Sequence, residues 1–282
     1  MRQESSIPPR ALPHRKAPVR SHLSMPFDPQ LAVRLSAGSL AFEYGQDVFG
    51  PPPELRSLDA IRYSLLSPSC QGPDPVYCIA MDVGRNEHAA TLRQRMLLFG
   101  VVAYEKGRLG DEPVRSQGHV HAVAPHCGWS TPELFEIWQG NAIIYAQETT
   151  ADQPGRCFAI EANPGDKIVI PPGWAHCVIN SNPETRMVFG AWCDRQYGFV
   201  YDGVRAHRGL AWFPLLRSDG IEWQRNSSYA PSQLVRRPAR SYPELGVLDS
   251  LPIYEQFARD PGRMQWVSEP ALVEPLWETF EP

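Results

Sequence analysis

The sequence predicts an all-β protein built as a sandwich or barrel, and two observations support that prediction. Short apolar runs rich in β-branched and aromatic residues recur from about residue 39 onward, and each is too short for a typical helix. Gly and Pro separate these runs, and a spacing of about 8–12 residues is typical of sandwiches and barrels. The seven predicted strands are 75–83, 95–105, 133–138, 141–148, 157–162, 167–172 and 186–193.

Composition is that of an ordinary globular protein. Of the 282 residues, 43% are hydrophobic and 21% charged, and the net charge of −4 provides no basic surface for nucleic acid. No apolar run reaches the roughly 20 residues of a membrane-spanning helix, and the first residues hold no signal-peptide core. The six cysteines form no CxxC pair, which favours reduced thiols in a cytoplasmic protein. We therefore expect no nucleic-acid partner and no membrane association.

Three regions are expected along the chain. Residues 1–24 are basic, rich in proline and poor in large apolar side chains, which predicts a flexible extension because such a segment buries too little surface to offset its ordering entropy. Residues 25–226 are expected to form one β domain, with its core barrel at about 75–215. Residues 227–282 are predicted as a tail packed on the barrel, loop-like at first and then helical around Ile253–Arg259.

A first group of residues with metal-ligand chemistry lies between residues 116 and 140. His119 and His121 are two residues apart, so on a strand both side chains point to the same face. Glu133 follows, and Gly140 lies seven residues beyond it. Two histidines on one strand are weak support for a metal site by themselves, because such a pair is often part of a polar core.

A second group begins 25 residues after Gly140, in the stretch GDKIVIPPGWAHCVIN. Its spacing is G-x5-P-x-G-x2-H-x3-N, in which the histidine is His176. Pro171 and Gly173 predict a tight turn that delivers His176 to the barrel interior. Three imidazoles and one carboxylate suit a divalent first-row metal such as iron, manganese, zinc or nickel.

Together the two groups resemble the paired motifs of the cupin superfamily. The first motif there runs HxH, a spacer, Glu, six residues and Gly, and the second is the spacing just given. The resemblance implies a double-stranded β-helix (jelly-roll) barrel, here with an N-terminal arm and a C-terminal tail of loop and helix. It also implies one divalent metal ion, Fe²⁺, Mn²⁺, Ni²⁺ or Zn²⁺, with positions left open for substrate oxygens. The implied metal ligands are His119, His121, Glu133 and His176.

The spacer between His121 and Glu133 is longer than is usual in cupins. It has eleven residues, AVAPHCGWSTP, and it contains His126 and Cys127, whose side chains also have ligand chemistry. We favour a surface loop over the barrel mouth for this insertion. Glu136 lies an odd number of residues from Glu133, so on a strand it faces the opposite side, and Glu133 is the ligand candidate.

A narrower resemblance rests on SQGHVH (116–121), PELFEIWQG (132–140) and PPGWAH (171–176). These stretches are similar to the archaeal-type (cupin) glucose-6-phosphate isomerases, and the likeness spans about 40–225, with RSLDAIR (56–62) resembling the family's opening arm. It implies a metal-dependent aldose–ketose isomerase that interconverts glucose 6-phosphate and fructose 6-phosphate or a related sugar phosphate, in glycolysis and gluconeogenesis. Relatives of this type pair their barrels, which implies a homodimer.

The resemblance also implies roles for residues around the metal. Glu133 is either a ligand or the base that moves a proton between C1 and C2, and both roles stay open. Tyr197, in the family's Y-G segment, is the second catalytic candidate. Ser116 fills the family's threonine position and Gly118 its glycine, which implies substrate or phosphate binding at both. Arg195 is a further phosphate candidate, because a guanidinium binds that dianion bidentately.

The phosphate subsite departs from the family pattern, so other functions stay open. A strand threonine of the family falls near Val101–Val102, which have no hydroxyl, and a family tyrosine aligns with Trp192. One alternative is an iron- or manganese-dependent cupin dioxygenase, which predicts an aromatic pocket, and another is a non-catalytic sugar-binding cupin. Candidates for an aromatic pocket are Phe135, Trp138, Tyr145, Trp174 and Trp192. The polar groups that an isomerase needs are sought at Ser116, Arg195, Tyr197 and His207.

Overall fold

A computed structural model describes residues 27–282, and the predicted 1–24 extension lies outside the described residues. Two sheets face each other across an open jelly-roll barrel, so the predicted all-β cupin class is confirmed. The larger sheet has the order β16 (Lys167–Ile170), β13 (Glu133–Gln139), β18 (Met187–Asp194), β7 (Leu97–Tyr104), β5 (Tyr77–Met81) and β4 (Glu54–Arg56). The smaller has the order β17 (Ala175–Asn180), β14 (Ala142–Gln147), β15 (Cys157–Ala162) and β22 (Leu234–Pro238).

The remaining elements are short. The paired strands outside the two large sheets are β1 (Val33–Leu35) with β2 (Phe42–Tyr44), β3 (Val48–Phe49) with β6 (Gly84–Arg85), β8 (Arg108–Leu109) with β9 (Glu112–Pro113), β10 (Val120–His121) with β19 (Phe199–Val200), β11 (Val123–Ala124) with β12 (Trp129–Ser130), and β20 (Trp212–Arg217) with β21 (Gly220–Arg225). The α-helices are α1 (Leu58–Ile61), α2 (Ala89–Gln94), α3 (Asp202–Ala206), α4 (Ile253–Arg259), α5 (Gln265–Ser268) and α6 (Glu274–Trp277). The 3₁₀ turns are η1 (Arg62–Ser64), η2 (Asn86–His88), η3 (Pro243–Leu245), η4 (Pro261–Met264) and η5 (Pro270–Val273).

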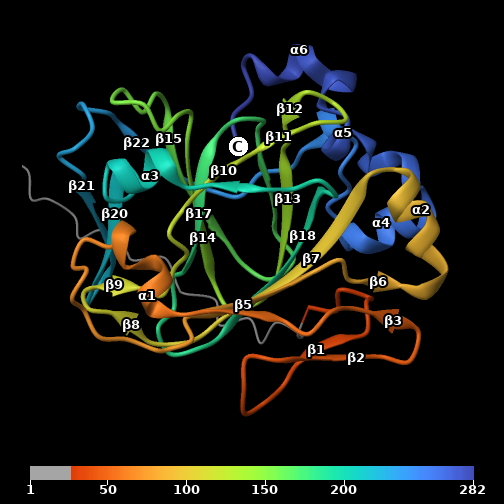
Figure 1. Ribbon diagram of the computed structural model, residues 1–282, viewed down its shortest axis with the longest axis horizontal. Coiled ribbons are helices and arrows are strands. Elements are labelled where there is room, and N and C mark those ends of the chain that lie inside the picture. The colour runs from red at the N-terminus through yellow and green to blue at the C-terminus, as the bar shows by residue number, and fades with distance from the viewer. Residues whose placement is uncertain (1–26) are drawn as a thin grey trace, which may run out of the picture.

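The six-stranded sheet is buried on both faces. Along β7, Leu98 and Val102 belong to the apolar cluster that fills the barrel, whereas Leu97 and Phe99 belong to a second cluster on the outer face. The C-terminal helices supply the other half of that outer cluster, and Figure 1 shows α4 and α5 packed beside β7 and β18. Burial on both faces explains why the sequence of β7 is a continuous apolar run with no polar alternation.

All seven predicted strands are present, and helix α4 has the bounds expected for the helix around Ile253–Arg259. The sequence did not predict β22, which lies in the supposed loop and pairs with β15 in parallel. It is an edge strand with three of its five residues exposed, so it shows no apolar alternation. It also did not predict α2, because Leu92 is the only buried residue of that six-residue helix and a single residue defines no face.

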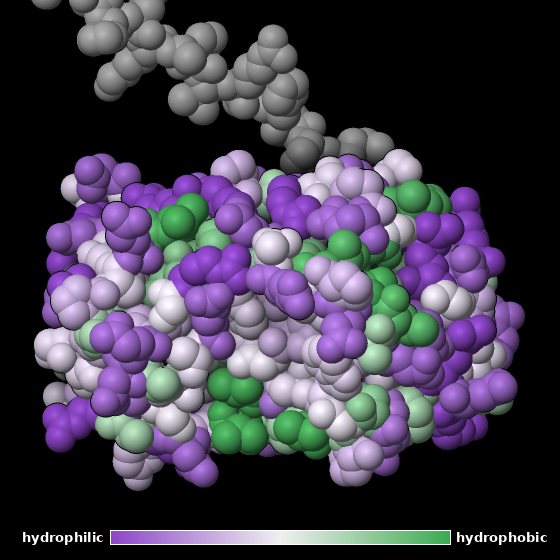
Figure 2. Space-filling view, turned by 90° about the horizontal axis from the view of Figure 1, so that it is seen from above, coloured by the Kyte–Doolittle hydropathy of each residue, from purple (hydrophilic) through white to green (hydrophobic). Residues whose placement is uncertain are grey.

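The described surface is mostly polar. Figure 2 shows one face of the molecule, on which apolar residues form small separate groups within a largely hydrophilic surface. Within residues 27–282, none of the helices combines the length and the hydropathy that crossing a bilayer requires. Most large apolar side chains are therefore packed in the clusters between and outside the two sheets.

Candidate metal centre

Three strand segments bring the predicted ligands together at one end of the barrel. His119 precedes β10 and exchanges two backbone hydrogen bonds with His176 of β17, at 3.0 and 2.9 Å. The tight turn that leads into β17 is present, with Trp174 N donating to Pro171 O at 3.4 Å. Glu133 is the first residue of β13, on the facing sheet. The side chains that the two sequence motifs supply therefore meet between the sheets.

The four predicted ligands form one compact cluster. Their ligand atoms all lie within 4.8 Å of one another, and three of the four residues are buried. Glu133 Oε2 lies 3.1 Å from His176 Nε2, with which it hydrogen bonds, and 3.2 Å from His121 Nε2. His119 Nε2 is buried and has no hydrogen-bond partner among the described residues. A buried, unpaired imidazole nitrogen beside two more imidazoles and a carboxylate fits a divalent first-row cation.

Backbone and thiol groups fix the orientation of these ligands. His121 Nδ1 lies 2.8 Å from Thr131 O, and His176 Nδ1 lies 3.3 Å from Trp174 O, so in both rings Nε2 is turned toward the centre. Cys193 donates its thiol hydrogen to Glu133 Oε1 across 3.3 Å, which leaves Oε2 for the imidazoles. Outer contacts of this kind determine the tautomer and the direction of a metal ligand.

The pKa shifts within the cluster follow from burial and from the contacts between its members. Burial, reinforced by His176 and His121, lowers the pKa of His119 well below its usual value, so this imidazole is neutral. Burial opposes charge on Glu133, but hydrogen bonds from His121 and His176 outweigh it and lower the pKa of the carboxyl. For His121 burial again lowers the pKa, but the Glu133 carboxylate 3.2 Å away reverses the shift, so the pKa is raised and a metal ion would have to displace that proton.

A cavity of about 60 Å³ adjoins the ligands on the inner face of the six-stranded sheet. Ser116 and Gly118, the two candidates for substrate binding, line it, and Ser116 Oγ accepts a hydrogen bond from Val178 N at 3.1 Å. Gly118 has a φ of +89°, and a Cβ there would lie 2.7 Å from Leu210 Cδ1. Glycine is therefore required at this position by backbone conformation and packing, whatever it contributes to a ligand.

Other predicted residues lie away from the cavity. Arg195 pairs with Asp82 through two hydrogen bonds of 2.7 and 3.0 Å, and it does not line the cavity. Tyr197 is 37% exposed and does not line the cavity. His126 and Cys127 stand outside the ligand cluster, in the β11–β12 loop, where His126 Nε2 lies 2.6 Å from Asp194 Oδ2. The phosphate role of Arg195 and the catalytic role of Tyr197 thus gain no support from their positions.

The cavity wall is apolar, but mainly through residues other than the five aromatic candidates. Phe135 is the one candidate that lines it. Trp138 and Trp192 lie in the outer cluster, and Tyr145 packs on the far face of the four-stranded sheet. The guanidinium of Arg156 lies over the ring of Trp174. The aromatic residues that do line the cavity beside Phe135 are Tyr77, Tyr104, Phe189, Phe199 and Tyr201. His207 lies in a separate surface groove.

Sequence reasoning missed the residues around one end of this cavity. Tyr77 and Tyr104 are cross-strand partners with ring centroids 4.8 Å apart, and Tyr201 approaches them from the segment before α3. Two arginines, Arg56 and Arg205, adjoin Tyr201. The alternation of β5 gave a signal for Tyr77, because every second residue from Tyr77 to Met81 lines the cavity. The sequence around Arg56 and Arg205 gave none.

Comparison with known proteins identifies the family. The family model described as Glucose-6-phosphate isomerase (GPI) matches residues 62–232, which is more than half of the chain. The chain belongs to the glucose-6-phosphate isomerase family. The predicted family resemblance is thereby confirmed, and all four metal-ligand candidates of this glucose-6-phosphate isomerase family member fall within the matched residues.

Solved structures similar to this glucose-6-phosphate isomerase family member are distant in sequence. An oxalate oxidase is 13% identical with a TM-score of 0.34, over 44% of this chain and 54% of that one. Vicilin from Capsicum annuum is 11% identical with a TM-score of 0.31, over 46% and 32%. A cupin superfamily protein from Desulfitobacterium hafniense is 13% identical with a TM-score of 0.23, over 34% and 65%. The chain thus spans about half the length of the oxalate oxidase. No curated protein sequence matches the chain significantly.

Proposed function

We propose that the protein is a metal-dependent aldose–ketose isomerase that interconverts glucose 6-phosphate and fructose 6-phosphate or a closely related sugar phosphate. The observation that supports this most is the convergence of three imidazoles and Glu133 beside a cavity, in a member of this family. A divalent metal ion bound there would polarise the substrate oxygens and stabilise the negative charge that develops during proton transfer.

Glu133 is the residue best placed to move the proton. Among residues 27–282 it is the only carboxylate that lines the cavity, so it is the only carboxylate base within reach of a substrate bound there. Its Oε1 is held by the Cys193 thiol and its Oε2 lies between two imidazoles, so the carboxylate plane is fixed. In this proposal Glu133 contacts the C1–C2 region, and Ser116 hydrogen bonds to the substrate farther along the cavity.

The segment 197–201, which we call the strap, closes the cavity over His119. Strand β19 of the strap pairs with β10, and the ring of Phe199 lies 4.4 Å from that of His119. A volume of about 60 Å³ is far below the roughly 300–1,000 Å³ of ligand pockets, so a sugar phosphate requires the strap to move outward. When it closes again, Phe199 and Tyr201 exclude water from the reacting carbons.

An assay of fructose 6-phosphate to glucose 6-phosphate conversion tests the proposal. Protein stripped by a chelator and reloaded with Fe²⁺, Mn²⁺, Ni²⁺ or Zn²⁺ is expected to turn over, and Glu133→Gln is expected to lose at least about a hundredfold in rate. His126→Gln is the matched control, because His126 lies outside the ligand cluster, and it should keep both metal and activity. Metal bound by wild type with no turnover under any loading would refute the isomerase assignment.

A cupin dioxygenase remains the second candidate because the cavity wall is largely apolar. Phe135, Phe189 and Phe199 all line the cavity, and a water-poor wall of this kind also suits O₂ chemistry. Oxygen consumption by the iron-loaded protein, measured with an oxygen electrode, distinguishes the two. Turnover of hexose phosphate without oxygen uptake would leave the isomerase alone.

The proposal extends to partners and location. We expect a sugar phosphate as ligand and, from the family likeness, a homodimer in the cytoplasm. Sedimentation velocity of the purified chain tests the dimer, and a monomer at every concentration would contradict it.

A further inference from the structure

We propose that Arg56 and Arg205 form a phosphate subsite at the end of the cavity bounded by Tyr77, Tyr201 and Gln117. The proposal rests on the proposed function for the sugar part of the ligand and adds the residues that recognise its phosphate. Among the described residues, the cavity wall lacks other charged groups that could bind a phosphate. Val102 offers no hydroxyl there, and Arg195 is held by Asp82 outside the cavity. The remaining lining residues with side-chain donors are uncharged or belong to the metal cluster.

Strand register aims Arg56 along the cavity wall. Arg56 of β4 is the direct cross-strand partner of Tyr77 of β5, and Tyr77 is the direct partner of Tyr104 of β7. Residues directly opposite each other on neighbouring strands lie on the same face of a sheet. Since Tyr77 and Tyr104 line the cavity, Arg56 continues their row by one position, to the edge of the sheet.

The guanidinium of Arg56 has bonding capacity to spare. Its Nε is buried and has no hydrogen-bond partner among the described residues. Its one carboxylate partner is Glu54, at 2.8 Å, whose side chain is 66% exposed. An ion pair with so exposed a carboxylate is weak and readily exchanged, whereas a buried unpaired donor favours a ligand oxygen. A phosphate can therefore replace Glu54 and also satisfy Nε, as a bidentate partner of Arg56.

Arg205 supplies a second positive charge beside Tyr201. Its guanidinium carbon lies 4.9 Å from the centre of the Tyr201 ring, and its Nε lies 3.4 Å from Oε1 of Gln117, a residue of the cavity wall. Within the part of the chain that the structure describes, no carboxylate forms an ion pair with Arg205. Two guanidiniums with one exposed counter-charge produce a local excess of positive charge, which suits a phosphate dianion.

Equilibrium binding of sorbitol 6-phosphate to the metal-loaded full chain tests the subsite. This probe has no carbonyl group, so it binds without being isomerised. Arg56→Gln is expected to weaken its binding by about 10- to 100-fold and Arg205→Gln by about tenfold, because each loses a charge-assisted contact. Glu54→Gln is expected to tighten it, because the competing carboxylate is gone. Arg93→Gln is the matched control: Arg93 is an exposed arginine of α2 whose side chain makes no ion pair within residues 27–282, and its loss should leave binding unchanged.

A metal titration of each variant completes the experiment. Unchanged metal affinity in Arg56→Gln, with weakened probe binding, shows that the loss is confined to the phosphate end. Arg56→Gln and Arg205→Gln variants that bind the probe as Arg93→Gln does would overturn the subsite, as would a wild-type protein that does not bind it. If the probe binds in an arginine-dependent way but the protein does not turn over hexose phosphates, the subsite stands and the isomerase assignment is refuted. The two proposals can therefore fail separately.

Discussion

The two faces of the six-stranded sheet are both buried, yet only one of them carries a reactive site, and strand β13 shows why. It presents Glu133 to the inner face and Glu136, three residues later, to the outer face. On the inner face hydrogen bonds from two imidazoles outweigh burial and lower the pKa of Glu133. On the outer face burial prevails and raises the pKa of Glu136 to about 7, although Lys167 lies 3.4 Å away. Two buried carboxyls of one strand thus have pKa values shifted in opposite directions, according to the hydrogen-bond donors and charges that each face of the sheet supplies.

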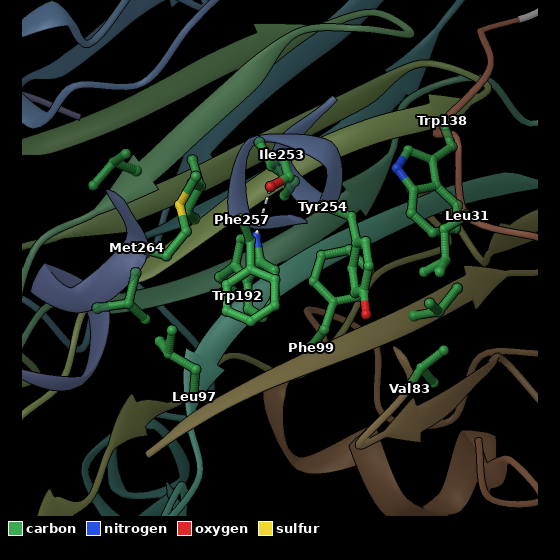
Figure 3. Close-up of a cluster of buried hydrophobic side chains, with 14 of the residues drawn as sticks. Leu31, Val83, Leu97, Phe99, Trp138, Trp192, Ile253, Tyr254, Phe257 and Met264 are labelled. Atoms are coloured by element: carbon green, nitrogen blue, oxygen red, sulfur yellow. Dashed lines mark hydrogen bonds between the residues drawn. The ribbon is translucent and has the colours of Figure 1, made fainter. Parts of the chain in front are cut away.

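The outer face uses its polar groups to anchor the C-terminal helices. Glu136 Oε1 accepts a hydrogen bond from Ile253 N at 3.0 Å, and Trp192 Nε1 donates to Ile253 O at 3.1 Å. Figure 3 shows Trp192 among Phe99, Tyr254 and Phe257, with the hydrogen bond to Ile253 drawn. Trp192, expected from the resemblance to replace a family tyrosine, is turned by β18 away from the cavity and into this aromatic cluster. The two faces of the sheet therefore have different roles. The inner face carries the candidate metal ligands, and the outer face carries the groups that anchor the C-terminal helices.

Removing the central anchor should give the largest effect on stability. Trp192 is fully buried, so Trp192→Ala leaves a cavity and an unpaired Ile253 carbonyl, and we expect a loss of about 3–5 kcal/mol in the free energy of unfolding. Urea denaturation followed by circular dichroism measures it. Metal affinity of the folded fraction should stay at the wild-type value, because the ligands lie on the other face. A large drop in metal affinity without loss of stability would show that Trp192 serves the site after all.

The pH dependence of stability isolates the contribution of Glu136. The folded-state pKa of about 7 lies above the unfolded value of 4.5, so the folded protein binds the additional proton. This contribution, roughly 3 kcal/mol, is complete below about pH 4.5 and is lost as the pH rises through 7. We expect Glu136→Gln to flatten the stability profile between pH 5 and 8 relative to wild type. Parallel profiles of the two proteins, from denaturation at each pH, would mean that Lys167 keeps Glu136 ionised throughout.

The sequence was most informative where chemistry and spacing coincide. The resemblance of the two spaced motifs to those of cupins implied His119, His121, Glu133 and His176 as ligands, and the structure brings all four together. Strand alternation separated Glu133 from Glu136, and that inference depends on local geometry alone.

The sequence was least informative where position depends on distant pairing. Arg195 faces Asp82, which is 113 residues away, and no local pattern reveals that contact. Arg56 is placed beside Tyr77 only through the β4–β5 register, and β22 pairs with β15 from the supposed tail. Such long-range contacts arise from topology, which spacing within one segment does not encode.

The smallest expected effect sharpens the comparison most, because it compares two adjacent residues of β18. Trp192 faces the aromatic cluster, whereas Cys193 faces the ligands and donates its thiol hydrogen to Glu133 Oε1 at 3.3 Å. Cys193→Val fills the same space without a donor, so Glu133 loses the contact that holds its plane. We expect about tenfold weaker metal binding, with little change in unfolding free energy.

Cys193→Ser is the matched control for this last change, because a hydroxyl keeps the donor. Isothermal titration of the stripped protein with Zn²⁺ measures the affinity. We expect wild type and Cys193→Ser to bind Zn²⁺ with similar affinity and Cys193→Val to bind it more weakly. If all three bind equally, the imidazoles alone orient Glu133, and the inner face would depend on its ligands without support from the strand beside them. If Cys193→Val lowers the free energy of unfolding as strongly as Trp192→Ala does, the two faces of β18 would share one structural role and the distinction between them would fail.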